Sequence, residues 1–156
     1  MEVLAQTRQW ITLLVPAQLS SGEEALQTLL SSSVMHSIEV DQSVRDNFVT
    51  AVREVLWNAI EHGGKLDPVQ QIRIDLLHSN RALSCFVKDP GPGFHIEKLV
   101  HAAINNPEED ALKHASIREE VGMRPGGYGI LLATSFADEL IYNEHGNEAL
   151  LVKYLR

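Results

Sequence analysis

Two side chains suited to metal binding and proton transfer, those of Glu54 and Asn58, stand four residues apart in a stretch that predicts a helix. Positions i and i+4 share one face of a helix, so both side chains would point toward one site. The amide oxygen of Asn58 is a hard, neutral ligand for Mg²⁺, and the carboxylate of Glu54 could accept a proton from water or an attacking hydroxyl. The polar side of any amphipathic helix can carry the same pair, so the spacing alone is a weak signal.

A second candidate motif is the turn Asp89-Pro-Gly91-Pro-Gly93. An ionised Asp89 could accept a hydrogen bond from the exocyclic amine of adenine, and the two glycines would let the backbone approach the base. The alternative is an ordinary tight turn with aspartate at its first position, which is common. Two glycines separated by proline make this turn unusually constrained, which favours a binding role.

A third motif, Arg124-Pro-Gly126-Gly127-Tyr-Gly129, precedes a predicted helix. Bare backbone N–H groups at a glycine-rich helix start can bind phosphate, and Arg124 could reach the β- or γ-phosphate. A flexible linker with a solvated arginine is the alternative. In this order along the chain, the three motifs predict an ATP site that uses Mg²⁺.

The elements that must position these motifs follow from the periodicity of apolar residues. The chain predicts, in order, a strand at 8–15 ended by Pro16, a helix from the capping-box spacing 21–24 to about Ser32, a long helix from an N-cap at Asp41 to Gly63 and Gly64, a hairpin at 71–76 and 82–88, a helix at 130–136, and a closing hairpin at 140–142 and 149–154. The glycine pair is expected to end the long helix with left-handed backbone. The stretch 105–123 has little apolar pattern and is a candidate mobile loop.

Hairpin-paired strands separated by helices predict the fold class. They favour an α+β two-layer sandwich, with a mixed, mostly antiparallel sheet and helices on one face, rather than a doubly wound parallel sheet. The length of the chain favours a single domain over 1–156. The long helix should bury one apolar stripe, which consists of Phe48, Val52, Val55, Leu56 and Ala59. The dinucleotide-binding glycine pattern and the P-loop pattern are both absent from the sequence.

Composition narrows the classes of partner. The formal net charge of −8 argues against nucleic acid, since no basic stripe could neutralise phosphates. We expect no membrane span and no secretory signal, because there is neither a long apolar run nor a basic-then-apolar N-terminal pattern. Cys85 is the only cysteine, which excludes an internal disulfide, fits a reducing cytoplasm and predicts buried filler within an apolar strand. The histidines form no i, i+4 pair, so a structural zinc site is not expected.

The three motifs resemble those of a GHKL-type (Bergerat-fold) ATPase domain, and most closely those of the bacterial anti-sigma-factor serine/threonine kinases. The N box is matched by Glu54-Val-Leu-Trp-Asn58-Ala-Ile-Glu-His62-Gly, the first glycine box by Asp89-Pro-Gly91-Pro-Gly93-Phe, and the second by Arg124-Pro-Gly126-Gly127-Tyr-Gly129-Ile-Leu-Leu. Each box alone is weak, but three in this order over residues 54–132 are a strong signal. The closing hairpin extends the resemblance over nearly the whole chain.

This resemblance implies a role for each matched residue. Glu54 would be the general base and Asn58 the magnesium ligand. Asp89 would contact adenine, while Gly91 and Gly93 shape its pocket. The second glycine box would bind the phosphates of ATP.

Further implications concern a lid, a turn and partners. The lid would cover the phosphates at about 95–125, and it is longer than in the short anti-sigma kinases. The last hairpin carries Gly146-Asn147 where such domains have Gly-Thr, which removes one hydroxyl from the nucleotide pocket. The family phosphorylates a serine or threonine of an anti-anti-sigma (STAS) partner, holds a sigma factor in its free state and commonly forms homodimers.

Two other functions stay open at this point. The chain could be a non-catalytic module that uses ATP as a conformational clamp in partner switching. It could also be a detached histidine-kinase catalytic domain, although no phosphoacceptor histidine helix precedes the motifs.

Overall fold

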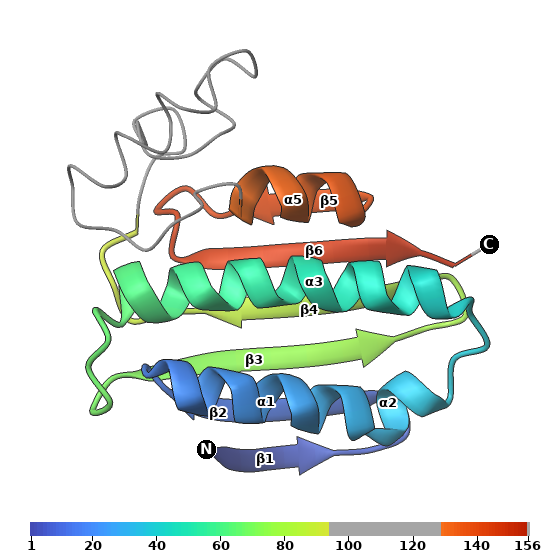
Figure 1. The fold of residues 1–156 in the computed structure, drawn as a ribbon, viewed down its shortest axis with the longest axis horizontal. Helices are drawn as coiled ribbons and strands as arrows, with labels where there is room; N and C mark the ends of the chain where they lie inside the picture. The colour runs from blue at the N-terminus through green and yellow to red at the C-terminus, as the bar shows by residue number, and fades with distance from the viewer. Residues whose placement is uncertain (94–128, 156) are drawn as a thin grey trace.

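The computed structural model describes residues 1–93 and 129–155 as one antiparallel sheet with helices on one face (Figure 1). Its elements are β1 (Glu2–Gln6), β2 (Trp10–Pro16), α1 (Leu19–Ser31), α2 (Ser33–His36), α3 (Gln42–Asn58), the π-helix η1 (Ala59–Gly63), β3 (Gln71–His78), β4 (Ala82–Lys88), α5 (Gly129–Phe136), β5 (Glu139–Tyr142) and β6 (Glu148–Tyr154). The expected lid at about 95–125, with the candidate mobile loop inside it, lies outside the described residues. So do Arg124, Gly126 and Gly127.

The six strands lie in the order β1-β2-β3-β4-β6-β5. Every neighbouring pair of these described strands is antiparallel, so the sheet is more regular than the mixed one that we expected. Because β6 pairs with β4, the closing hairpin joins the sheet directly beside the strand that leads into Asp89. The predicted α+β class with helices on one face is confirmed.

The core lies between the sheet and helices α1, α3 and α5, all of which cover the same face (Figure 1). The apolar stripe predicted for the long helix is confirmed, since its four side chains in α3 and the fifth, Ala59 in η1, are all buried. On the sheet side the core consists of alternate strand residues, among them Ile74, Val87 and Leu151, because successive side chains in a strand point to opposite faces. Cys85 is buried among them, as predicted, and burial raises the pKa of its thiol.

The expected capping box at Ser21 is wrong. Helix α1 begins at Leu19, and the buried Ser21 hydroxyl instead accepts a hydrogen bond of 2.9 Å from the amide Nε2 of Gln18. The helix starts early because its first turn packs on the helix layer: a Cβ at Gly22 would lie 2.9 Å from a ring carbon of Trp57. The predicted N-cap position, Asp41, does precede α3, but its side chain makes no capping hydrogen bond.

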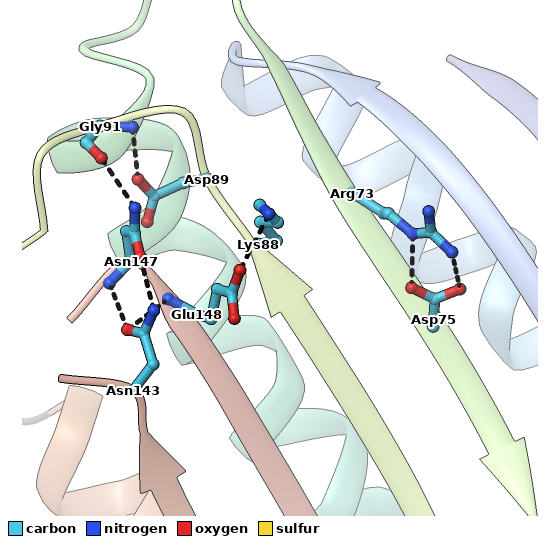
Figure 2. Close-up of polar contacts among 8 residues, drawn as sticks. All are labelled: Arg73, Asp75, Lys88, Asp89, Gly91, Asn143, Asn147 and Glu148. Carbon is cyan, nitrogen blue, oxygen red and sulfur yellow. Dashed lines mark hydrogen bonds and ion pairs between the residues drawn. The ribbon is translucent and has the colours of Figure 1, made fainter. Parts of the chain in front are cut away.

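A polar network around the buried side chains of Thr12 and Asp75 lies on the sheet face that the helices do not cover. The indole N–H of Trp10 donates to the Thr12 hydroxyl at 2.6 Å, and that hydroxyl donates to Asp75 at 2.5 Å. Arg73 donates to both oxygens of the same carboxylate, at 2.7 and 3.1 Å (Figure 2). Burial by itself would raise the pKa of Asp75, but the hydrogen bonds from Arg73 and Thr12 outweigh it, and the net pKa is lowered.

Thr12→Val should lower the free energy of unfolding by roughly 1–3 kcal/mol at pH 7, because a buried carboxylate loses a hydroxyl donor. A carboxyl whose folded-state pKa is lowered stabilises the fold above its unfolded pKa of about 3.9 and loses that contribution as pH falls through the folded-state value. The difference in free energy of unfolding between Thr12→Val and wild type should therefore be smaller in acid. Urea unfolding at pH 7 and at pH 3 measures it. Thr50→Val, which removes a hydroxyl bonded only within α3, is the control. A difference independent of pH would contradict the assignment.

Candidate functional site

Helix α3 carries both residues of the first motif near its C-terminal end. Asn58 is its last residue, and Glu54 lies one turn earlier on the same helix, half-buried. The helix then continues as the π-helix η1, where the N–H of Gly64 donates to the carbonyl of Ala59 at 2.8 Å. Single π-helical turns often occur at functional sites, and the last residue of this one, Gly63, lies against Asp89, which directly follows β4.

The second motif begins directly after β4. The carboxylate Oδ1 of Asp89 accepts the backbone N–H of Gly91 at 2.8 Å, which closes the turn on itself (Figure 2). Burial raises the pKa of Asp89, and the hydrogen bond from Gly91 opposes this only in part. The turn therefore presents a partly desolvated carboxylate at the edge of the helix layer.

Gly63 lies against this carboxylate, which the sequence did not indicate. A Cβ at Gly63 would lie 2.1 Å from the carboxyl carbon of Asp89, and a Cβ at Gly91 would lie 2.8 Å from the Cα of Gly63. The expected left-handed backbone at the glycine pair is wrong, because positive φ occurs instead at Lys65 (54°) and Leu66 (57°). Gly63 is needed for close approach rather than for chain reversal, and its place as the last residue of the N box was the only signal in the sequence.

A small cavity joins the first two motifs. Asn58 and Asp89 both line it, together with Asn147 and an apolar floor that includes Val87 and Ala149. Its volume is about 10 Å³, close to what one water molecule needs, so it is the floor of a site rather than room for a whole nucleotide. Tyr142 also lines it, and burial together with the charge of Asp89 raises the pKa of its phenol. Glu54 is not part of this lining; it stands one helical turn from Asn58.

The turn between β5 and β6 forms the other wall of the site, and the sequence pointed to it only through Gly146-Asn147. The backbone carbonyl of Asn147 accepts the N–H of Asp89 at 3.0 Å, and its side-chain Nδ2 donates to the carbonyl of Gly91 at 3.1 Å (Figure 2). Gly93, with φ of 79°, is pressed against the same turn, since a Cβ there would lie 1.6 Å from the carbonyl oxygen of His145. Nothing in the local sequence of either turn predicts this contact.

The third motif is described only at its last glycine. Gly129 begins α5, which confirms the helix predicted at 130–136, and α5 packs beside α3 (Figure 1). The roles proposed for Arg124, Gly126, Gly127 and Gly129 in phosphate binding stay predictions. Of the candidate residues, the structure brings Asn58 and Asp89 to one cavity, with Gly91 and Gly93 in the adjoining turn.

Comparison with known families shows which family this domain belongs to. Residues 15–153 match the family model of the histidine kinase-like ATPase domain. The chain belongs to this family. The match spans all three motifs, so the cavity at Asn58 and Asp89 lies within an ATPase domain. A search of curated proteins finds no match.

Within the described residues, no helix is both long enough and apolar enough to cross a membrane.

Proposed function

We propose that this chain is a Mg²⁺- and ATP-dependent serine/threonine protein kinase of the anti-sigma type. It would phosphorylate a STAS partner, sequester a sigma factor in its free state, and act in the cytoplasm as a homodimer. The observation that carries the nucleotide part is the shared cavity of Asn58 and Asp89, which are 31 positions apart in the sequence yet line one floor. The kinase subfamily and its partners rest on the three boxes and on the retained Glu54.

The proposed chemistry follows from the positions of these side chains. As the oxygen of a serine or threonine hydroxyl attacks the γ-phosphorus of ATP, Glu54 accepts its proton. A new O–P bond forms, the bond to the bridging β–γ oxygen breaks, and ADP leaves. Asp89 holds the adenine amine, which fixes the nucleotide relative to α3.

Magnesium fits the donor set of this cavity. The described residues contain no cluster of three or more histidine, cysteine or acidic side chains that could hold a metal. A single amide oxygen, that of Asn58, suits an ion that takes most of its ligands from triphosphate and water. When bound, Mg²⁺ would neutralise charge on the transferred phosphoryl group.

Glu54→Gln is the central test. Nucleotide affinity should stay near wild type because glutamine keeps the shape of the side chain and leaves Asn58 and Asp89 in place, whereas transfer of γ-phosphate to the STAS partner should fall roughly 100- to 10,000-fold with loss of the base. Calorimetry with Mg-ADP measures the first quantity, and radiolabel transfer from γ-labelled ATP to purified STAS-domain proteins of the same organism measures the second. Glu61→Gln, on the same stretch, is the matched control.

The outcomes separate the candidate functions. If wild-type protein binds Mg-ATP but labels none of these STAS proteins, the kinase proposal fails and the non-catalytic clamp accounts for the site. If the protein binds no nucleotide at all, both the kinase proposal and the clamp hypothesis fail. Asn58→Ala should reduce nucleotide affinity in the presence of Mg²⁺ and leave the much weaker affinity in EDTA unchanged.

A further inference from the structure

The β5–β6 turn is hydrogen-bonded to both ends of the Asp89 turn. The backbone of Asn147 accepts the N–H of Asp89 at 3.0 Å, and its side chain donates to the carbonyl of Gly91 at 3.1 Å. The two bonds join residues far apart in sequence, and together they span the three-residue turn from Asp89 to Gly91. The position of the Asp89 carboxylate is therefore set from outside its own loop.

Asn143 determines which way the Asn147 amide points. Its Oδ1 accepts two backbone N–H groups, those of Asn147 at 3.0 Å and Glu148 at 3.2 Å, and its Nδ2 donates to Oδ1 of Asn147 at 2.8 Å. Backbone N–H groups can only donate, so the oxygen of Asn143 must face them and its Nδ2 must face Asn147. This leaves the Nδ2 of Asn147 facing the carbonyl of Gly91, which can only accept.

The orientation of these two side-chain amides also affects the carboxylate of Asp89. With the turn held at Gly91, its N–H donates to Oδ1 of Asp89, and no described residue donates to Oδ2. One carboxylate oxygen is thus used within the turn, and the other is left as an acceptor. A single acceptor suits one exocyclic amine and disfavours a carbonyl at the same place, since two acceptors repel.

We propose that Asn143 and Asn147 are positioning residues for nucleobase selectivity: they hold the Asp89 turn so that Oδ2 meets the exocyclic amine of a 6-aminopurine. This inference rests on the proposed nucleotide binding and goes beyond it by assigning base discrimination to the β5–β6 turn. Neither asparagine is a catalytic residue, because each acts through the Asp89 turn.

The test compares ADP with IDP, whose hypoxanthine carries a carbonyl in place of the amine. Wild-type chain should prefer ADP, and Asn147→Ala should lower ADP affinity about tenfold, the size expected for a misplaced hydrogen bond to a charged group, with IDP affinity unchanged. The ratio of the two dissociation constants, measured by calorimetry, should fall toward one. If the two asparagines had only a structural role, the affinities for ADP and IDP would fall equally and the ratio of the two dissociation constants would be preserved.

A second variant keeps the test decisive if Asn147→Ala folds poorly. Asn143→Asp retains an oxygen for the two backbone N–H groups but replaces the donor to Asn147 with an acceptor, so it should reverse the Asn147 amide and lower the same ratio. Asn80→Ala, in the exposed β3–β4 turn, is the control and should leave both affinities unchanged. A preserved ADP preference in both variants overturns the inference while nucleotide binding stands. Failure of wild type to bind either nucleotide overturns the proposed function together with it.

Discussion

Gly93→Ala will impair the site more than alanine at any other glycine that the structure describes, with the proposed phosphotransfer falling roughly 100-fold, the scale of loss that misplaced groups at an active site can produce. The added Cβ would lie 1.6 Å from the carbonyl oxygen of His145 and 2.4 Å from its carbonyl carbon. Both atoms belong to backbone, and the hydrogen bonds of Asn143 hold that turn in place. Relief must therefore come from the Asp89 turn, which will move away from Asn147.

Stability will fall together with activity in this variant. Gly93 has φ of 79°, and alanine in left-handed backbone costs about 1–2 kcal/mol before any overlap is counted. Urea unfolding measures the loss of stability, radiolabel transfer from γ-labelled ATP measures phosphotransfer, and calorimetry with Mg-ADP measures nucleotide affinity. Pro92→Ala, at the exposed neighbouring position, should retain nucleotide binding. Wild-type ADP affinity in Gly93→Ala would show that the contact with His145 does not support the site.

Asp89→Asn will separate nucleotide binding from stability. The amide keeps an oxygen for the N–H of Gly91 but offers no charged acceptor for the base amine, so nucleotide affinity should fall roughly 10- to 100-fold. The free protein should nevertheless be more stable than wild type at pH 7. Burial raises the pKa of Asp89, which means that the folded state disfavours its ionised form.

The sign of the pH dependence follows from linkage. A carboxyl with a raised folded-state pKa stabilises the fold fully below its unfolded pKa of about 3.9 and loses that contribution as pH rises through the raised value. The stability gain of Asp89→Asn should therefore be largest near neutral pH and shrink toward pH 3. Thermal unfolding of the ligand-free protein across that range measures it. Asp67→Asn, in an exposed turn, is the control; a less stable Asp89→Asn at pH 7 would contradict the role of burial.

Local patterns predicted most of the secondary structure. The hairpin of β3 and β4, the closing hairpin and the buried face of α3 all follow from apolar spacing within a few residues. β1 was missed because a short edge strand, Glu2–Gln6, has a burial pattern without clean alternation and pairs through an irregular register. The start of α1 was misplaced because the capping-box spacing at 21–24 is a local signal. In the structure the helix begins earlier, where Gly22 packs against Trp57.

The sequence by itself determined the chemistry that the site can offer: an amide oxygen at Asn58, a carboxylate at Asp89 and glycines beside it, in an order typical of one ATPase family. Tertiary structure alone decided how these groups meet. The order of strands places β6 beside β4, so Asn147 reaches a carbonyl 56 positions away and Gly63 lies against Asp89. Such contacts depend on which strands pair and on how closely two backbone segments approach. The spacing of apolar residues along a strand or a helix predicts neither of these.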